Sequence, residues 1–70
     1  MDRKCVIPAN TNLYRQKPVV NSRYKFFQKN QPMPGFVVEE ELLNGVKYKK
    51  ILTGEGCFWV RAAYLGNGRI

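Results

Sequence analysis

The sequence predicts an all-β fold, and three observations lead to this prediction. Asn44-Gly45 is the dipeptide most typical of a two-residue hairpin, because both residues tolerate the positive φ angles of a type I′ turn. The segment that follows, 46–52, contains β-branched and aromatic residues in partial alternation with lysines. Four Tyr, four Phe and one Trp supply bulk for the core of a 70-residue domain. Helix formers within 37–52 leave a helix there as the local alternative.

The first strand is expected within residues 4–14, where Cys5-Val6-Ile7 and Leu13-Tyr14 are apolar. Pro8 and the turn formers over 10–12 interrupt it. A long irregular connection over 15–35 follows, and connections of this length in compact domains are usually functional or disordered. The aromatic residues of this connection are expected to fold back onto the sheet; they are Tyr24, Phe26 and Phe27.

Three strands over 36–43, 46–52 and 57–61 are expected to form a meander, with turns at 44–45 and 53–56. The first turn sets the register of its hairpin. Counted outward from that turn, the facing pairs are Leu43–Val46, Glu41–Tyr48, Glu40–Lys49 and Glu39–Lys50. Two of the three acids then face lysines, and each such pair contributes about 0.2–1 kcal/mol. The charges therefore support the hairpin and explain the acids without a catalytic role.

Side-chain alternation in the last predicted strand separates its residues into two sets. Phe58 and Val60 point to one face and are expected in the core. Trp59 and Arg61 point to the other face, where Trp59 either covers the sheet or contacts a ligand. The alternation therefore predicts a sheet with one apolar face and one face open to a partner.

The cysteines and the absence of an apolar leader bear on location. Cys5 and Cys57 are expected as small buried residues with reduced thiols, and a bridge between them is the alternative for an exported protein. No apolar h-region follows residues 1–4, and no apolar run approaches the ~20 residues of a spanning helix. We therefore expect a cytoplasmic protein with no membrane partner.

The segment from Trp59 to Leu65 resembles the closing segment of bacterial SH3 (SH3b) domains, which reads Gly-Trp-Val, two or three small or polar residues, then Tyr-Leu. Residues 12–15 are similar to the family's Leu-Asn-Val-Arg segment, and 33–38 occupy the place of its Gly-x-x-Val strand. Phe58 stands where the family has Gly. The resemblance implies a small five-stranded SH3-like barrel with a long first loop, formed by residues 1–65 and followed by a short tail over 66–70. The small size and the initiating Met suit a small accessory protein of a bacterium or phage.

The chain contains few of the residues that enzymes use for catalysis. Histidine is absent, Ser22 is the only serine and Asp2 the only aspartate, so a Ser-His-Asp or Cys-His arrangement cannot be assembled. Two cysteines without histidine fall short of the four ligands of a structural zinc site. We therefore expect a binding protein that is not an enzyme and has no metal and no cofactor.

The formal net charge of +7 favours anionic partners, and two classes of partner stay open at this stage. The first is an acidic protein or peptide bound by a surface of aromatic and basic side chains. Its predicted residues are Tyr14, Arg15, Tyr24, Lys47, Trp59, Arg61 and Tyr64. The oligomeric state is left open.

The second class is nucleic acid, held by basic side chains on phosphates with aromatic rings stacked on bases. Its predicted residues are Arg15, Lys17, Arg23, Lys25, Lys47, Lys49, Lys50 and Arg61. The competing interpretation is that Lys49 and Lys50 pair with the glutamates opposite them and that the remaining charges are solvated.

Overall fold

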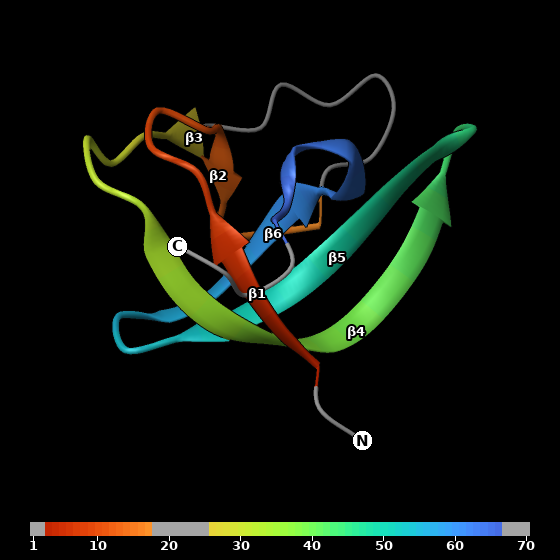
Figure 1. Ribbon diagram of the computed structural model, residues 1–70. Helices are drawn as coiled ribbons and strands as arrows, with labels where there is room; N and C mark the ends of the chain where they lie inside the picture. Colours follow the sequence, from red (N-terminus) through yellow and green to blue (C-terminus); the bar gives the residue numbers. More distant parts are fainter. Residues whose placement is uncertain (1–2, 18–25, 67–70) are drawn as a thin grey trace.

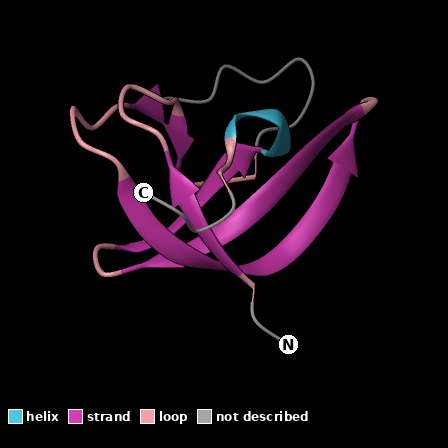
Figure 2. Ribbon diagram, viewed as in Figure 1, coloured by secondary structure: helices cyan, strands magenta, loops and turns pink. Residues whose placement is uncertain are grey.

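The computed structural model describes residues 3–17 and 26–66, which form one antiparallel sheet of six strands (Figure 1). Its strand order is β1-β4-β5-β6-β2-β3. The strands are β1 (Lys4–Ile7), β2 (Leu13–Tyr14), β3 (Phe26–Phe27), β4 (Met33–Leu43), β5 (Val46–Thr53) and β6 (Gly56–Arg61). A single 3₁₀ turn, η1 (Ala62–Tyr64), follows β6 (Figure 2). The all-β prediction is confirmed, and the helix alternative for 37–52 is wrong, because these residues form the β4–β5 hairpin.

The β4–β5 hairpin turns at the predicted dipeptide. Asn44 and Gly45 have φ angles of 51° and 81°, the left-handed values that a type I′ turn requires. The register agrees with the prediction at all four pairs, Leu43–Val46, Glu41–Tyr48, Glu40–Lys49 and Glu39–Lys50. The residues of the turn therefore fix the pairing register in the half of the hairpin nearest the turn.

A β-bulge interrupts the ladder further from the turn. The register shifts between Val37 and Glu39, so Val38 is an extra residue in β4. Val37 is buried, whereas Val38 is 49% exposed. Bulges bend the strand that carries them, and Figure 1 shows β4 and β5 curving together through this region.

The predicted five-stranded barrel differs from the observed sheet in two ways. Residues expected in a single first strand form two separate strands, because Asn10 adopts a left-handed φ of 63° and the chain turns between them. β1 pairs with β4, whereas β2 pairs with β6 and β3 at the other end of the strand order. Within residues 3–17 and 26–66 no ladder joins β1 to β3, so these strands do not close a barrel. β3 lies within the predicted long loop.

The chain returns to β1 after the 3₁₀ turn. Gly66 forms an antiparallel bridge with Val6, and the Gly66 N–H donates to the Val6 carbonyl at 2.9 Å. Residue 66, assigned from the sequence to a tail, is thus paired with the first strand. Residues 67–70 lie outside the described residues.

The core lies on the concave side of the sheet, which we call the inner face. Phe58 and Val60 are fully buried there, as predicted, together with Ile51. Phe27 packs edge-on against Phe58 with ring centroids 5.2 Å apart. The remaining members of the buried cluster are Cys5, Ile7, Leu13, Met33 and Val37. The thin apolar core therefore draws on every strand of the sheet.

The two cysteines have different environments. Cys5 is buried, and burial raises the pKa of its thiol, partly offset by the charge of Lys49. Cys57 is exposed, so the expectation that both cysteines are buried is wrong for Cys57. Cys57 is exposed because it pairs with Leu52, and paired residues point to the same face of the sheet; Leu52 is itself 46% exposed. Both thiols are free.

Candidate functional site

The outer face of the sheet carries a row of aromatic side chains. The register pairs Tyr14 with Phe26 and with Trp59, so the three side chains lie on the same face. Trp59 is on the side opposite to Phe58 and Val60, which fixes this face as the outer one. The T-shaped contact of Tyr48 with Tyr14 extends the row to β5. We call this set the aromatic strip; its members are Phe26, Tyr14, Trp59 and Tyr48.

Ring contacts hold the aromatic strip in a defined shape. The Tyr14 ring lies 6.0 Å from that of Phe26 and 6.3 Å from that of Tyr48, with interplanar angles of 57° and 85°. Tilted and edge-to-face pairs of this kind contribute about 0.5–1.5 kcal/mol beyond the area they bury. Phe26 is 54% exposed, while Tyr14 and Tyr48 are half-buried. The strip therefore presents ordered apolar surface to a partner.

Trp59 forms the buried base of the strip. Only 5% of it is exposed, and the Lys17 ammonium lies 5.6 Å from its ring centroid. Lys17 also pairs with Glu41 at 2.6 Å, and this hydrogen bond raises the pKa of Lys17. A partner would reach the Trp59 ring only after Lys17 moves, so the accessible rings are those of Tyr14, Phe26 and Tyr48.

Arg61 and Tyr64 lie at the end of the strip. Arg61 is opposite Tyr48 in the β5–β6 ladder, and its guanidinium lies 5.8 Å from the ring centroid of Tyr64. Tyr64 belongs to η1 and is 50% exposed. The turn is closed by the Leu65 N–H, which donates to the Ala62 carbonyl at 3.2 Å. An aromatic ring and a cation are thus presented together beside β6.

Two of the residues predicted for a peptide surface lie elsewhere. The Arg15 guanidinium lies over the rings of Phe27 and Phe58, 4.8 Å and 5.4 Å from their centroids, on the inner side of the sheet. Lys47 lines a pocket with Arg61 at the hairpin end of the sheet. Tyr24 lies outside the described residues. The structure therefore brings together Tyr14, Trp59, Arg61 and Tyr64 of the predicted set.

Sequence reasoning missed Phe26 and Tyr48 as members of this surface. Tyr48 was available from the predicted register, because it shares its face with Glu41 and with every second residue along β5. Nothing in the sequence indicated that Phe26 belongs to this surface. Its position depends on the pairing of two-residue strands that are distant in sequence, β2 and β3.

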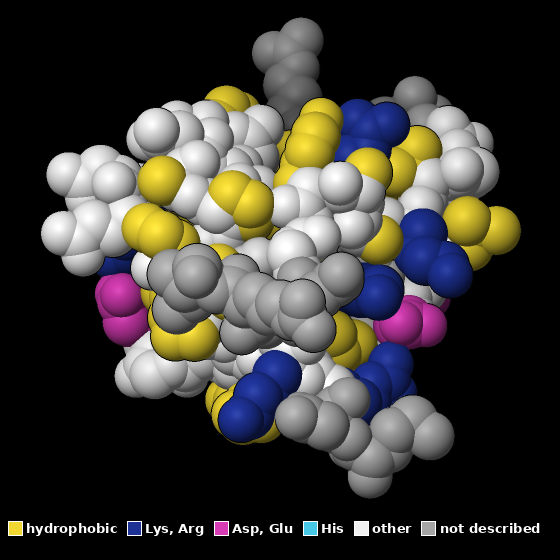
Figure 3. Space-filling view, in the orientation of Figure 1, with side chains coloured by type: hydrophobic (Ala, Val, Ile, Leu, Met, Phe, Trp, Pro, Cys, Tyr) yellow, Lys and Arg dark blue, Asp and Glu magenta, His cyan; other side chains and the backbone are white. Residues whose placement is uncertain are grey.

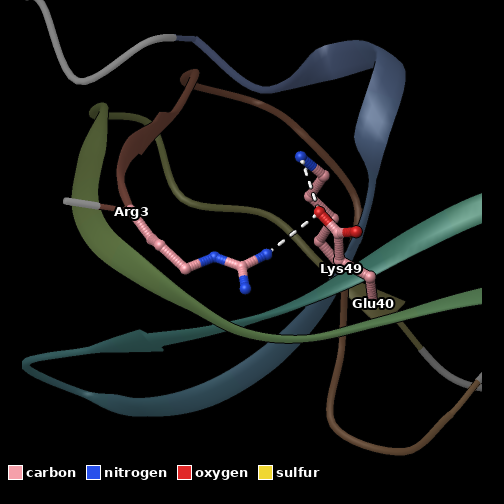
Figure 4. Close-up of polar contacts among 3 residues, drawn as sticks. All are labelled: Arg3, Glu40 and Lys49. Atoms are coloured by element: carbon pink, nitrogen blue, oxygen red, sulfur yellow. Dashed lines mark hydrogen bonds and ion pairs between the residues drawn. The ribbon is translucent and has the colours of Figure 1, made fainter. Parts of the chain in front are cut away.

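Three of the eight basic residues predicted for nucleic-acid binding are neutralised or turned away, namely Lys17, Lys49 and Arg15. Glu40 lies between Arg3 and Lys49 at 3.2 Å from each (Figure 4). The hydrogen bond from Lys49 and the surrounding positive charges lower the pKa of Glu40. Lys29 pairs with Glu55 at 2.8 Å. Figure 3 shows acidic side chains lying beside basic ones on the visible face.

The remaining cations of that set form no continuous track. Lys17 is held by Glu41, and Arg15 stacks on inner-face rings. Lys50 lies opposite both Glu39 and Trp59 in the sheet, but no ion pair joins it to Glu39. Arg23 and Lys25 lie outside the described residues. Among residues 3–17 and 26–66, no group of three or more His, Cys, Asp or Glu could hold a metal ion.

No family model, no curated protein and no solved structure matches the chain. In the described part of the chain, no helix has the length and apolar character needed to cross a bilayer. The functional argument therefore rests on the geometry of the outer face.

Proposed function

We propose that this protein is a non-catalytic SH3-like binding module that holds an acidic protein or peptide segment along the aromatic strip. The observation that carries the proposal is the ordered row of rings from Phe26 through Tyr14 to Tyr48, which ends at Arg61. Rings with polar tips, combined with arginine, are the composition found at binding hot spots. An apolar contact and a charge contact are available to one extended ligand.

The chain path supports the SH3-like part of the proposal. β4, β5 and β6 form a meander with two tight turns, a 3₁₀ turn follows, and Gly66 then returns to pair with Val6 of β1. In this interpretation β2 and β3 are the two arms of the long first loop. Four of the five family strands then correspond to β1, β4, β5 and β6, and the Gly66–Val6 bridge lies where the fifth is expected to pair with β1. The free thiols suit a cytoplasmic setting, as in a small accessory protein of a bacterium or phage.

Charge on the outer face favours a protein segment over a nucleic acid. Glu41 lies opposite Tyr48, and Glu39 lies opposite Lys50, so the strip is bordered by acids as well as by cations. A phosphate backbone would meet repulsion there, whereas binding of nucleic acid draws on several unneutralised Lys and Arg. A peptide with apolar side chains and one acidic group can avoid the acids and reach Arg61.

The test is selection of displayed random 12-residue peptides on the wild-type protein, followed by measurement of Kd from the fluorescence of Trp59. We expect Tyr48→Ala to weaken the selected peptides about tenfold, because a hot-spot truncation costs more than ~1 kcal/mol. Phe36→Ala is the matched control, since Phe36 is a 49% exposed aromatic outside the strip. The control should retain wild-type affinity.

A second arm of the experiment measures binding of mixed-sequence single-stranded DNA and RNA at two salt concentrations. We expect no binding at physiological salt. Tight binding that falls steeply with salt, together with failure to select any peptide, would overturn the proposal in favour of nucleic acid. Equal loss of peptide affinity in the Tyr48 and Phe36 variants would remove the strip as the binding surface.

A further inference from the structure

The centre of the aromatic strip already holds a cation, the ammonium group of Lys17. Its Nζ atom lies over the Trp59 ring, 5.6 Å from the centroid, and 2.6 Å from the Oε2 atom of Glu41. An aromatic face attracts a cation through its quadrupole, and a carboxylate adds a charge-assisted hydrogen bond. The contacts of Lys17 therefore show which ligand chemistry this position accepts.

The walls of this position belong to the sheet. Glu41 lies opposite Tyr48, which lies opposite a β6 residue two positions from Trp59, so the three side chains share the outer face. Tyr48 and Tyr14 come from strands on either side of β6, yet their rings are in contact at 6.3 Å, so they meet across β6. We call this set the cation cradle; its members are Trp59, Glu41, Tyr14 and Tyr48. Strand pairing and ring contacts hold it in place.

The present occupant of the cradle is held less firmly than the walls. Lys17 lies outside the strands, three residues beyond the end of β2. Its side chain is 41% exposed, and that of Glu41 is 39% exposed. Exposed ion pairs of this kind contribute little to stability. Another cation can therefore replace Lys17 at a small cost in free energy.

The charges around the cradle leave it short of one cation when Lys17 moves away. In the described part of the chain, Glu41 forms no ion pair except the one with Lys17. Glu39 lies on the same face, and the pKa of Lys17 is raised first by the hydrogen bond to Glu41 and also by the charge of Glu39. Lys50 and Arg61 share this face, but neither is joined to Glu41. A vacant cradle would thus leave a carboxylate beside an open indole ring.

We propose that the cation cradle is a subsite of the binding module, in which a Lys or Arg side chain of the bound segment takes the place of Lys17. The proposal rests on the proposed function, since the segment reaches the cradle by lying along the aromatic strip. The basic residue of the ligand meets Glu41 and the Trp59 ring, while its acidic group meets Arg61. The preferred ligand is therefore a segment that carries both charges.

The first experiment tests the subsite without a peptide. n-Butylammonium chloride is titrated at constant ionic strength into the wild type, into Lys17→Met and into the double variant with Glu41→Gln. Binding is followed by the fluorescence and the indole N–H resonance of Trp59, the only tryptophan. We expect Lys17→Met to bind the probe about fivefold more tightly than the wild type, because no internal ammonium competes. The double variant should lose this gain.

Lys29→Met is the matched control. Lys29 also pairs with a glutamate, Glu55, at 2.8 Å and lies over a ring, that of Phe27, at 5.9 Å from the centroid. This variant should bind the probe like the wild type. Thermal unfolding checks each fold, and Lys17→Gln takes the place of Lys17→Met if the latter does not fold. Trp59 signals that stay unchanged in the folded variant would overturn the subsite.

The second experiment uses peptides selected on the wild type from the random 12-residue library. Replacing the Lys or Arg of a selected peptide by Gln should weaken binding about tenfold on the wild type, but less than about twofold on Glu41→Gln. Lys17→Met should tighten the same peptides about threefold, because no internal cation has to be displaced. Weaker binding to Lys17→Met would show that Lys17 itself contacts the ligand, which contradicts the subsite.

The outcomes separate the two proposals. Selected peptides that bind the strip but require no Lys or Arg would overturn the subsite while leaving the proposed function standing. Failure to select any peptide, together with tighter binding of n-butylammonium to Lys17→Met, would overturn the proposed function and leave the cation site. Both proposals stand if the peptides require a basic residue and depend on Glu41.

Discussion

The two faces of the same sheet are built from alternate residues of the same strands, yet they differ in how far their aromatic side chains are buried and in what covers them. Along β6, Phe58 and Val60 are 1% and 0% exposed on the inner face, and they are surrounded by aliphatic and aromatic side chains. On the outer face, Arg61 is exposed and Trp59 is covered by the long side chain of Lys17. One strand thus contributes to folding with one set of residues and to recognition with the other.

The contrast between the two faces indicates where the stability and the binding capacity of this 70-residue chain reside. A domain of this size buries only about 60% of the surface that its unfolded chain exposes, so the inner face supplies most of the folding energy. The outer face keeps rings such as Phe26 and Tyr14 partly exposed, held by ring contacts instead of by full burial. Substitutions on the two faces should therefore separate stability from binding.

The largest effect is expected for Phe58→Ala on the inner face. Removal of this buried ring should cost about 3–5 kcal/mol of unfolding free energy, because it leaves a cavity beside Phe27 and beneath Arg15. Tyr48→Ala on the outer face should cost less than half as much, while it weakens peptide binding. Urea unfolding followed by circular dichroism measures both. Similar losses of stability in the two variants would contradict the separation of the faces.

If Phe58→Ala does not fold, Ile51→Val tests the same face more gently. Ile51 is fully buried, and the loss of one methylene group from it should cost about 0.5–1.5 kcal/mol. The peptide affinity of this variant should remain that of the wild type at temperatures where it is folded.

An effect smaller than that of Phe58→Ala is expected for Gly35→Ala, which adds one methyl group to the inner face. A Cβ at this position would lie 2.6 Å from both the Ile51 Cγ2 atom and the Leu52 carbonyl oxygen, so the β4–β5 ladder must shift. We expect a loss of about 1–3 kcal/mol, as for other overpacked cores. Gly54→Ala is the matched control, since no atom lies within 4 Å of its added Cβ. Equal stability of the two variants would show that the inner face is loosely packed.

The smallest effect is expected for Glu40→Gln, which removes the carboxylate between Arg3 and Lys49. The pKa of Glu40 is lowered in the folded protein, first by the hydrogen bond from Lys49. A lowered pKa stabilises the fold above the ordinary glutamate range, and this contribution is lost as the pH falls through the lowered value. The wild type should therefore lose slightly more stability than Glu40→Gln between about pH 5 and pH 3, measured by thermal unfolding. A steeper acid loss in the variant would contradict this sign.

The local features of the hairpin and the alternation of β6 could be predicted from the sequence. Asn44-Gly45 sets a two-residue turn, and counting outward from it gives the Glu40–Lys49 pair that the structure shows at 3.2 Å. The prediction stops at the bulge, because nothing in the residues around Val38 marks an extra position in the ladder. The burial of Phe58 and Val60 could also be predicted, because side chains two positions apart in a strand point to the same face and both of these are apolar.

The candidate site could be predicted only in part, because its members come from strands that are distant in sequence. Tyr14 was identified, but Phe26 was not, because its place depends on the β2–β3 pairing. Tyr48 was available from the predicted hairpin register, but its contact with Tyr14 depends on the β2–β6 pairing. Arg15 was assigned to the same surface, yet it stacks on inner-face rings. Adjacent residues of a strand point to opposite faces, so a short motif alone does not show which face meets the partner.

The all-β class, the reversal at Asn44-Gly45 and the residues that this turn places opposite one another follow from local sequence, because they depend on backbone preferences and a period of two within a short stretch. Three other features follow only from the assembled sheet: Lys17 lies over the Trp59 ring, Cys57 is exposed, and Lys47 and Arg61 line the same pocket. These outcomes depend on contacts between segments separated by many residues. Their energies are set by packing and charge in the assembled sheet and not by the local sequence.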